Sequence, residues 1–279
     1  MIPAPFDYEV ADSVEHAVEL LNAREDSKLL AGGHSLIPLL RLRIARPALL
    51  VDLGRLDSLR YVREANDRLA IGALTRHHDL QHDPLLQEHC PLVSHTAGLI
   101  GDPQVRHRGT IGGSLAHGDP ASDLPAVLLA LDAEFVVHGP DGERTVQAGE
   151  FFRAVFETAL GPSDVLTEIR VRKQGPAGWS YVKFTRRAQD WATVGVAAVV
   201  RRSNGSIEEA AIALTNMGPT PVRARTAEDA FRSPGDVGAA AEVVAAESDP
   251  PSDTGGSSEY RRHLATVLTR RALGDAISK

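Results

Sequence analysis

Two glycine pairs constrain this chain more than any other feature. The first lies in residues 31–35, AGGHS, and the second in residues 110–114, TIGGS. Glycine has no Cβ, so its backbone reaches positive φ and approaches a ligand closely, and successive N–H groups can then surround an anion. We therefore predict two loops that hold a phosphorylated ligand through the backbone, with Gly112 and Gly113 at positive φ.

A helix N-terminus is expected beside each loop. The apolar run 36–42 follows the first loop directly, and Asp123 stands at the head of the run 124–131 after the second. Asp123 suits a helix cap, and Pro125 suits a first helical turn, where the missing N–H costs nothing. The hydroxyls of Thr110 and Ser114 add hydrogen-bonding groups to the second loop. This arrangement favours binding of a negatively charged group.

The spacing excludes the two best-known phosphate-binding motifs. Neither loop has the GxGxxG of a Rossmann fold or the GxxxxGK[ST] of a P-loop, and neither carries a phosphate-binding lysine. One glycine pair alone is most often an ordinary turn. Two pairs in one chain, both without lysine, suit a pyrophosphate held by amide dipoles between two subdomains.

Charge and cysteine content narrow the class of protein. The net charge of −7 and pI of about 5.9 argue against a nucleic-acid or anionic-membrane surface. Cys90 is the only cysteine, so this chain cannot ligate an iron–sulfur cluster through four thiolates. No stretch approaches the ~18 apolar residues of a membrane span, and no signal peptide is evident. We expect a cytoplasmic protein.

The order of the elements predicts an α+β protein in three parts. Residues 1–55 form a small α/β subdomain, residues 56–174 a second one, and residues 175–279 an antiparallel sheet with three helical segments. Within the second part, residues 83–96 are predicted to form one helix, and a Pro-Asp-Gly turn within residues 134–148 predicts a hairpin. The segment QGPAG at 174–178 marks the last boundary.

Three motifs resemble a known family. They are AGGHS at 31–35, IGDPQVRHRGTIGGSLAHGDPASDLPAVLLALDA at 100–133 and DWATVGVAAVV at 190–200. They resemble the FAD-binding medium subunit of molybdenum hydroxylases, which includes aerobic carbon monoxide dehydrogenases and the FAD subunits of xanthine dehydrogenases. The resemblance implies a two-subdomain FAD-binding domain of the PCMH type, followed by a C-terminal three-stranded antiparallel sheet with helices.

The resemblance also implies a set of cofactor-binding residues. The two loops would hold the pyrophosphate, Asp123 would bind near the diphosphate or ribitol, and Leu166 would offer a backbone contact to the flavin ring. Trp191 stands where the family usually has tyrosine, DWAT for DYAT, and would lie beside the isoalloxazine. From the residues alone, Asp123 is equally a simple cap and Trp191 a core residue. The implied set is Ala31, Gly32, Gly33, His34, Ser35, Thr110, Ile111, Gly112, Gly113, Ser114, Asp123, Leu166, Lys183 and Trp191.

For function, the resemblance implies an oxidoreductase subunit with non-covalent FAD and no catalytic residue or metal of its own. A large subunit with molybdopterin cytosine dinucleotide would oxidise the substrate, and a small subunit with two [2Fe–2S] clusters would relay electrons. This chain would pass those electrons through FAD to an external acceptor, which is quinone, oxygen or NAD. The implied assembly is a dimer of heterotrimers, a heterohexamer.

Two alternatives stay open. One is a stand-alone FAD oxidase of the vanillyl-alcohol oxidase type, in which a histidine such as His34 attaches FAD covalently. It requires a substrate pocket and an acid/base pair, for which the sequence offers no candidate, and no Ser-His-Asp or HExxH pattern is present. The other is a scaffold subunit that has lost its flavin, which the intact glycine loops disfavour.

Overall fold

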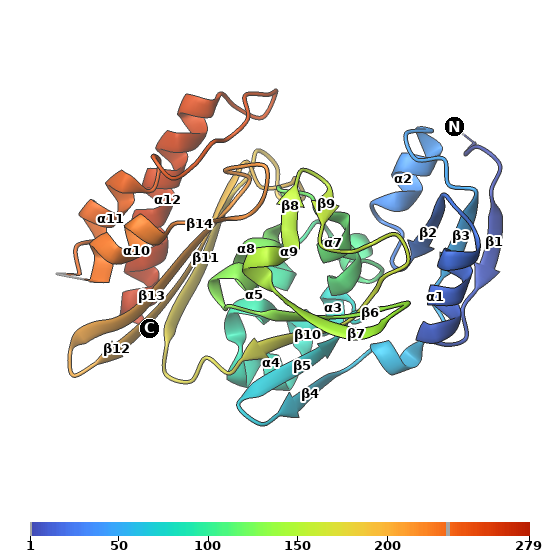
Figure 1. The fold of residues 1–279 in the computed structure, drawn as a ribbon. Helices are drawn as coiled ribbons and strands as arrows, with labels where there is room; N and C mark the ends of the chain where they lie inside the picture. Colours follow the sequence, from blue (N-terminus) through green and yellow to red (C-terminus); the bar gives the residue numbers. More distant parts are fainter. Residues whose placement is uncertain (1, 233–234) are drawn as a thin grey trace.

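The computed structural model describes residues 2–232 and 235–279. The three larger β-sheets of the described chain follow one another in sequence and lie roughly in a row across the molecule (Figure 1). The N-terminal sheet lies at one end, the largest sheet is central, and the C-terminal sheet with its helices lies at the other end. The mixed α/β architecture and the C-terminal antiparallel sheet with helices confirm the predicted fold class.

The N-terminal sheet is parallel and has the order β1-β3-β2. Its elements are β1 Asp7–Val10, α1 Val14–Ala23, β2 Ser27–Leu30, α2 Leu36–Arg41 and β3 Leu49–Asp52. The central strand β3 is buried at Leu49, Leu50 and Val51 because α1 packs over the sheet. The N-terminal core also includes Leu74 and Val165 from the middle of the chain, so this unit shares its core with the next.

The middle sheet has five antiparallel strands in the order β4-β5-β10-β6-β7. They are β4 Val62–Ala65, β5 Arg68–Gly72, β6 Glu134–Gly139, β7 Gly142–Gln147 and β10 Val165–Arg172. The pairing of Gly139 with Gly142 confirms the predicted hairpin. The 3-10 helix η1 Asp57–Leu59 precedes the sheet, and the short hairpin β8 Phe152–Ala154 with β9 Glu157–Thr158 lies beside it.

Seven helices belong to the middle unit of the described chain. They are α3 His77–His82, α4 Pro84–His89, α5 Pro91–Gly98, α6 Pro103–Arg106, α7 Ile111–His117, α8 Asp123–Ala130 and α9 Ala148–Phe151. The prediction of one helix over 83–96 is wrong. The chain makes two helices that meet at Cys90, because Pro91 has no N–H for an i−4 bond and restricts the residue before it.

The C-terminal sheet consists of three long strands and one short strand. They are β11 Gly178–Phe184, β12 Val194–Ser203, β13 Ser206–Thr215 and the two-residue β14 Val222–Arg223, which the prediction of three strands lacked. The helices α10 Arg225–Arg232, α11 Val237–Val243 and α12 Ser258–Ser278 cover one face. The opposite face packs on α8, so the sheet is buried on both sides. The domain limits at 55 and 174 stay predictions.

Among the described residues, no helix combines the length and hydrophobicity that a bilayer span requires.

Candidate functional site

The first glycine loop joins β2 to α2 and leaves its backbone amides available. Gly33 has a φ of 78°, the left-handed conformation that glycine adopts without strain. Within residues 2–232 and 235–279, the amides of Gly32, Gly33, His34 and Ser35 donate to no acceptor of the chain. Four consecutive N–H donors just before a helix form the kind of site that binds an anion. The predicted nest is therefore present in the geometry of this loop.

The second glycine loop is built differently from the prediction. Gly112 and Gly113 lie in the first turn of α7, so the expected positive φ is wrong at both positions. Thr110 caps this helix, and its Oγ1 accepts the amide of Gly113 at 3.2 Å. The amides of Ile111 and Gly112 donate to the carbonyls of Thr75 and Ala73, respectively, at 3.0 and 2.8 Å.

The N–H groups of residues 111–114 thus have acceptors inside the chain. What this loop offers to a ligand is the hydroxyl of Thr110, the hydroxyl of Ser114 and the positive end of a short helix. The sequence could not show this difference, because a glycine pair permits both an open nest and a tight helical turn.

The glycines of both loops allow close packing. A Cβ on Gly112 would lie 2.6 Å from the Cβ of Ala73, and a Cβ on Gly32 would lie 2.3 Å from the carbonyl oxygen of Arg108. A Cβ on Gly113 would lie 3.7 Å from that of Ala31. The first loop therefore packs directly on the residues that lead into the second, and the two bends, 80 residues apart in sequence, form one site.

His77 lies beneath this junction and is buried, at 4% exposure. Its amide donates to the carbonyl of Gly109 at 3.0 Å, while its Nδ1 has no hydrogen-bond partner in the described chain. Burial lowers the pKa of His77 to about 4, and the nearby His34 and Arg106 lower it further. The imidazole is therefore neutral near pH 7 and adds no charge to the site.

Asp123 is the first residue of α8, and Ser122 occupies the N-cap position where the sequence placed Asp123. Both carboxylate oxygens are engaged by β11. Oδ1 accepts the hydroxyl of Tyr181 at 2.7 Å, and Oδ2 accepts Nζ of Lys183 at 2.8 Å. Burial raises the pKa of Asp123, and the charge and hydrogen bond of Lys183 oppose that rise. Asp123 is thus a buried ion-pair partner.

The two remaining predicted residues have opposite environments. Leu166 is buried in β10. The residue after it, Thr167, accepts a hydrogen bond from the amide of Ala73 through its backbone carbonyl at 2.9 Å. Because Ala73 also packs on Gly112, Leu166 lies near the second loop. Trp191 is 57% exposed in the loop between β11 and β12, so the interpretation as a core residue is wrong.

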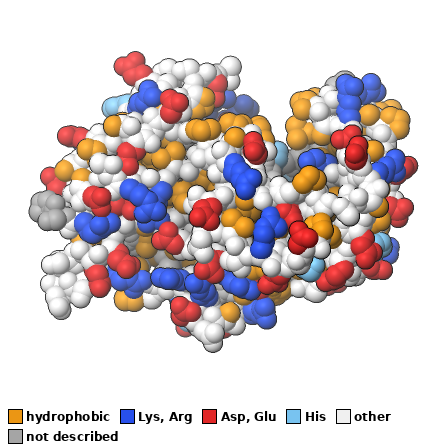
Figure 2. Space-filling view, viewed as in Figure 1, with side chains coloured by type: hydrophobic (Ala, Val, Ile, Leu, Met, Phe, Trp, Pro, Cys, Tyr) orange, Lys and Arg blue, Asp and Glu red, His pale blue; other side chains and the backbone are white. Residues whose placement is uncertain are grey.

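The surface is hollowed at this junction. Figure 2 shows a notch at the upper edge, between the N-terminal lobe that carries α2 and the middle of the molecule. The two glycine loops join these two parts of the chain. Two exposed apolar side chains are Ile37 on α2, just after the first loop, and Phe156, whose amide donates to the carbonyl of Gly118 at the end of α7. In the described residues, no cluster of three or more His, Cys, Asp or Glu could hold a metal ion.

Comparison with known proteins identifies the family. Residues 4–173 match the FAD binding domain in molybdopterin dehydrogenase, and residues 179–276 match the CO dehydrogenase flavoprotein C-terminal domain. The carbon monoxide dehydrogenase medium chain of Hydrogenophaga pseudoflava is 44% identical, over 99% of this chain and 98% of its own. The chain belongs to the family of FAD-binding medium subunits of molybdenum hydroxylases. It is thus related to oxidoreductase subunits.

Other members of this medium-subunit family are also similar over their full lengths. A 6-hydroxypseudooxynicotine dehydrogenase complex subunit alpha from Paenarthrobacter nicotinovorans is 40% identical, over 100% of this chain and 97% of its own. A solved structure of carbon monoxide dehydrogenase from Hydrogenophaga pseudoflava, which lacks the Mo-pyranopterin moiety of its cofactor, matches with a TM-score of 0.98 over 100% of this chain and 99% of that chain. The resemblance predicted from the three motifs is therefore confirmed.

The residues present fit the FAD that this family binds. The first loop supplies four amides suited to a diphosphate, and a Cβ at Gly32 would collide with the backbone of Arg108, so the two loops close only around glycine. The individual contacts to FAD stay predictions. Sequence reasoning missed Tyr181, which donates to Asp123, and Thr215, which contacts the hydroxyl of Tyr181, because neither belongs to a recognisable motif.

Proposed function

We propose that this chain is the electron-exit flavoprotein of a molybdenum hydroxylase complex, and that its two glycine loops hold the diphosphate of FAD. The observation that carries the proposal is the run of four available amides from Gly32 to Ser35, where Gly32 packs against the backbone of Arg108 and Gly109 just before the second loop. Backbone dipoles bind a dianionic diphosphate without a lysine. FAD, when bound, accepts electrons singly and releases them singly or in pairs.

The roles of individual residues follow from their positions. We expect the amides of the first loop to bind the phosphate oxygens, and the hydroxyls of Thr110 and Ser114 to donate to the same group. Leu166 would border the flavin through its backbone, and Trp191 would contact the ring from its exposed loop. An ammonium has three N–H donors, and Lys183 uses two of them on Asp123 and the carbonyl of Leu99. Its third would serve the cofactor.

The remaining chemistry belongs to partner subunits. We expect a large subunit with molybdopterin cytosine dinucleotide, a small subunit with two [2Fe–2S] clusters and an assembly of two heterotrimers in the cytoplasm. Support comes from the relatives, which are named as medium chains or as subunits of complexes. Electrons would leave toward an external acceptor, namely quinone, oxygen or NAD.

The test is the flavin content of the purified full-length chain. We expect visible flavin absorption bands, and denaturation should release free FAD into solution because attachment is non-covalent. Flavin that stays on the denatured chain would point to covalent attachment at a residue such as His34, as in the stand-alone oxidases. A colourless protein that takes up no added FAD would contradict the proposal and favour a scaffold subunit.

A further inference from the structure

The face of the C-terminal sheet that packs on α8 carries an unusual polar group. Most of this face is small and apolar, as Ala197, Ala211 and Ala213 join the core of the middle unit. Among them, Tyr181 is 4% exposed and its hydroxyl lies against α8. Burial of a polar group is unfavourable unless the group makes hydrogen bonds, so the partners of the Tyr181 hydroxyl decide whether it stabilises this interface.

The sheet is shaped to let this hydroxyl reach its partners. Lys183, Gly195 and Thr215 are cross-strand neighbours on β11, β12 and β13. A Cβ on Gly195 would lie 2.4 Å from the hydroxyl oxygen of Tyr181, so any larger residue would displace the phenol. Through this gap the hydroxyl contacts Thr215 Oγ1 at 3.1 Å and Asp123 Oδ1 at 2.7 Å.

Tyr181 supplies a hydrogen bond to a buried ion pair. Asp123 and Lys183 form an ion pair whose side chains are only 4% and 7% exposed. Desolvation of two such charges is unfavourable unless additional hydrogen bonds satisfy the remaining lone pairs. Lys183 satisfies one carboxylate oxygen, and Tyr181 satisfies the other. Without Tyr181, the carboxylate of Asp123 would be left with one buried oxygen lacking a donor.

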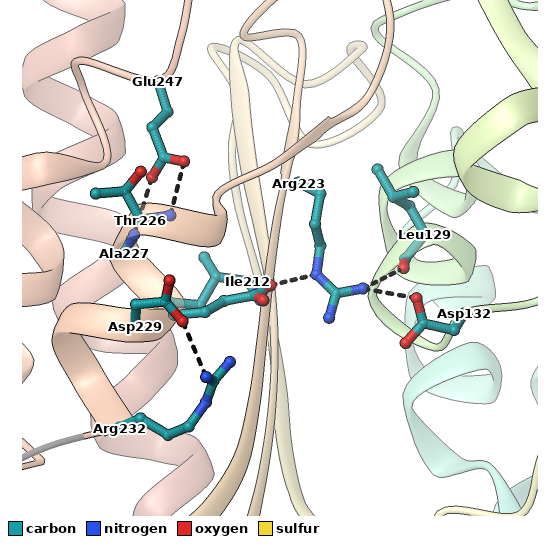
Figure 3. A network of polar contacts seen from close by, with 10 residues as sticks. Leu129, Asp132, Ile212, Arg223, Thr226, Ala227, Asp229, Arg232 and Glu247 are labelled. Carbon is teal, nitrogen blue, oxygen red and sulfur yellow. Dashed lines mark hydrogen bonds and ion pairs between the residues drawn. The ribbon is translucent and has the colours of Figure 1, made fainter.

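The other end of α8 is held by the same sheet. Arg223 of β14 donates from one nitrogen to the carbonyl of Leu129 at 2.8 Å and to Asp132 at 3.0 Å, as Figure 3 shows. Its Nε donates to Glu228, which also accepts the amide of Ile212. The helix that begins at Asp123 is therefore fixed at both ends by the C-terminal sheet.

The segment that precedes α8 is fixed as well. The amide of Asn216, one residue beyond β13, donates to the carbonyl of Pro120 at 2.9 Å. The side-chain amide of Asn216 donates to the carbonyl of Ala192, next to Trp191, at 2.7 Å. The end of β13 thus connects the turn between α7 and α8 with the exposed loop that carries Trp191.

We propose that Tyr181 is a positioning residue of the cofactor site, which holds the Asp123–Lys183 ion pair in the orientation that FAD binding requires. The proposal rests on the proposed function above. Through Tyr181 and Thr215, the C-terminal sheet sets the position of the start of α8 and of the Lys183 ammonium. The sheet therefore contributes to flavin binding as well as to the stability of the chain.

The experiment compares two tyrosines that each bind a buried carboxylate. Tyr181→Phe removes the bond to Asp123, and Tyr61→Phe removes a bond of 2.6 Å to Glu168, which lies on the middle sheet. In both variants of the full-length chain, the measurements are urea unfolding, the Kd of FAD for the flavin-stripped protein and the visible circular dichroism of bound FAD. Tyr181→Phe should lose more stability, because Oδ1 of Asp123 then has no donor, whereas Oε2 of Glu168 keeps the guanidinium of Arg63 at 2.9 Å. The affinity for FAD and the dichroism of bound FAD, rather than the stability, therefore distinguish the two variants.

We expect the Kd to rise about tenfold in Tyr181→Phe, with a changed flavin dichroism, and to stay within about twofold in Tyr61→Phe. In an Asp123→Leu background, which has no acceptor for the phenol, Tyr181→Phe should change the Kd of FAD little further. Thr215→Val, which keeps the phenol and removes only its neighbour, should raise the Kd about threefold and serves if Tyr181→Phe does not fold.

The outcomes separate this proposal from the function on which it rests. If the wild-type chain binds no FAD, the proposed function fails. If the wild-type chain binds FAD while Tyr181→Phe and Thr215→Val match Tyr61→Phe in affinity and dichroism, FAD binding stands and the positioning role of Tyr181 is refuted.

Discussion

Gly32→Ala tests whether the close approach of the two loops creates the cofactor site. The added Cβ would lie 2.3 Å from the carbonyl oxygen of Arg108 and 2.9 Å from both its carbonyl carbon and the Cα of Gly109. All three atoms belong to the backbone, so no side chain can rotate away, and the two loops must separate. Overpacking of this kind costs about 1–3 kcal/mol.

The same displacement moves the amides of the first loop relative to the hydroxyl of Thr110. We expect the Kd of FAD to rise by about 10- to 100-fold, which corresponds to about 1.4–2.8 kcal/mol of binding free energy. Gly113→Ala is a milder variant for comparison. Its Cβ would lie 2.8 Å from Oγ1 of Thr110, a side-chain atom, and at an ordinary contact distance of 3.7 Å from the Cβ of Ala31, so we expect a smaller loss of affinity.

Gly274→Ala is the matched control. Gly274 lies within α12 and a Cβ there would meet nothing within 4 Å, so alanine should stabilise the helix by up to about 1 kcal/mol without changing the Kd. The assay is titration of the flavin-stripped full-length chain with FAD, followed by flavin fluorescence. Wild-type affinity in Gly32→Ala, with a folded chain by circular dichroism, would refute the idea that the loop contact shapes the site.

Three further predictions concern stability and the flavin environment. Burial lowers the pKa of His77 to about 4, from about 6.5 in the unfolded chain, so the unfolded chain takes up this proton first as the pH falls. The free energy of unfolding should therefore decrease by about 3 kcal/mol between pH 6.5 and pH 4. In urea unfolding measured across that range, His77→Phe should reduce this dependence on pH. Arg223→Met leaves the carboxylate of Glu228, 2% exposed, without its cation, and should lower the free energy of unfolding by about 3–5 kcal/mol, which Glu228→Gln in the same chain should partly restore. Trp191→Ala should change unfolding by no more than about 0.5 kcal/mol because the side chain is exposed, yet shift the absorption bands of bound FAD, and unchanged bands would place Trp191 away from the flavin.

The sequence predicts which two loops meet at the candidate site, but not how each loop is built. Both glycine pairs were recognised, and the structure brings them together as predicted. The expected positive φ at Gly112 and Gly113 was wrong because helix α7 begins at Ile111, and there the glycines serve packing against Ala73 and the cap of Thr110. Composition alone cannot distinguish these uses, since both need the absence of a Cβ.

Contacts between distant strands and helices were beyond sequence reasoning. Asp123 and Tyr181 are 58 residues apart, and nothing local in either segment indicates that a phenol on β11 will meet the start of α8. The cap at Ser122 was missed for a related reason, because Ser and Asp are both favoured caps and only the backbone decides between neighbours. Residue type alone would place Trp191 in the core, because large aromatic side chains are usually buried, but its side chain is 57% exposed. Its place beside the flavin stays a prediction.

The residues that local sequence patterns identify and those that they do not identify lie in different parts of the molecule. The residues that local patterns identify, such as the glycine loops, supply the groups that would contact FAD. The residues that patterns missed, such as Tyr181 and Thr215, belong to a separate sheet whose other face is covered by α10, α11 and α12. An ion pair between Asp123 and Lys183 is stable when buried only if its geometry is held from both sides. The C-terminal unit would therefore be required for flavin affinity although it has no glycine loop of its own, and Tyr181→Phe measures that requirement directly.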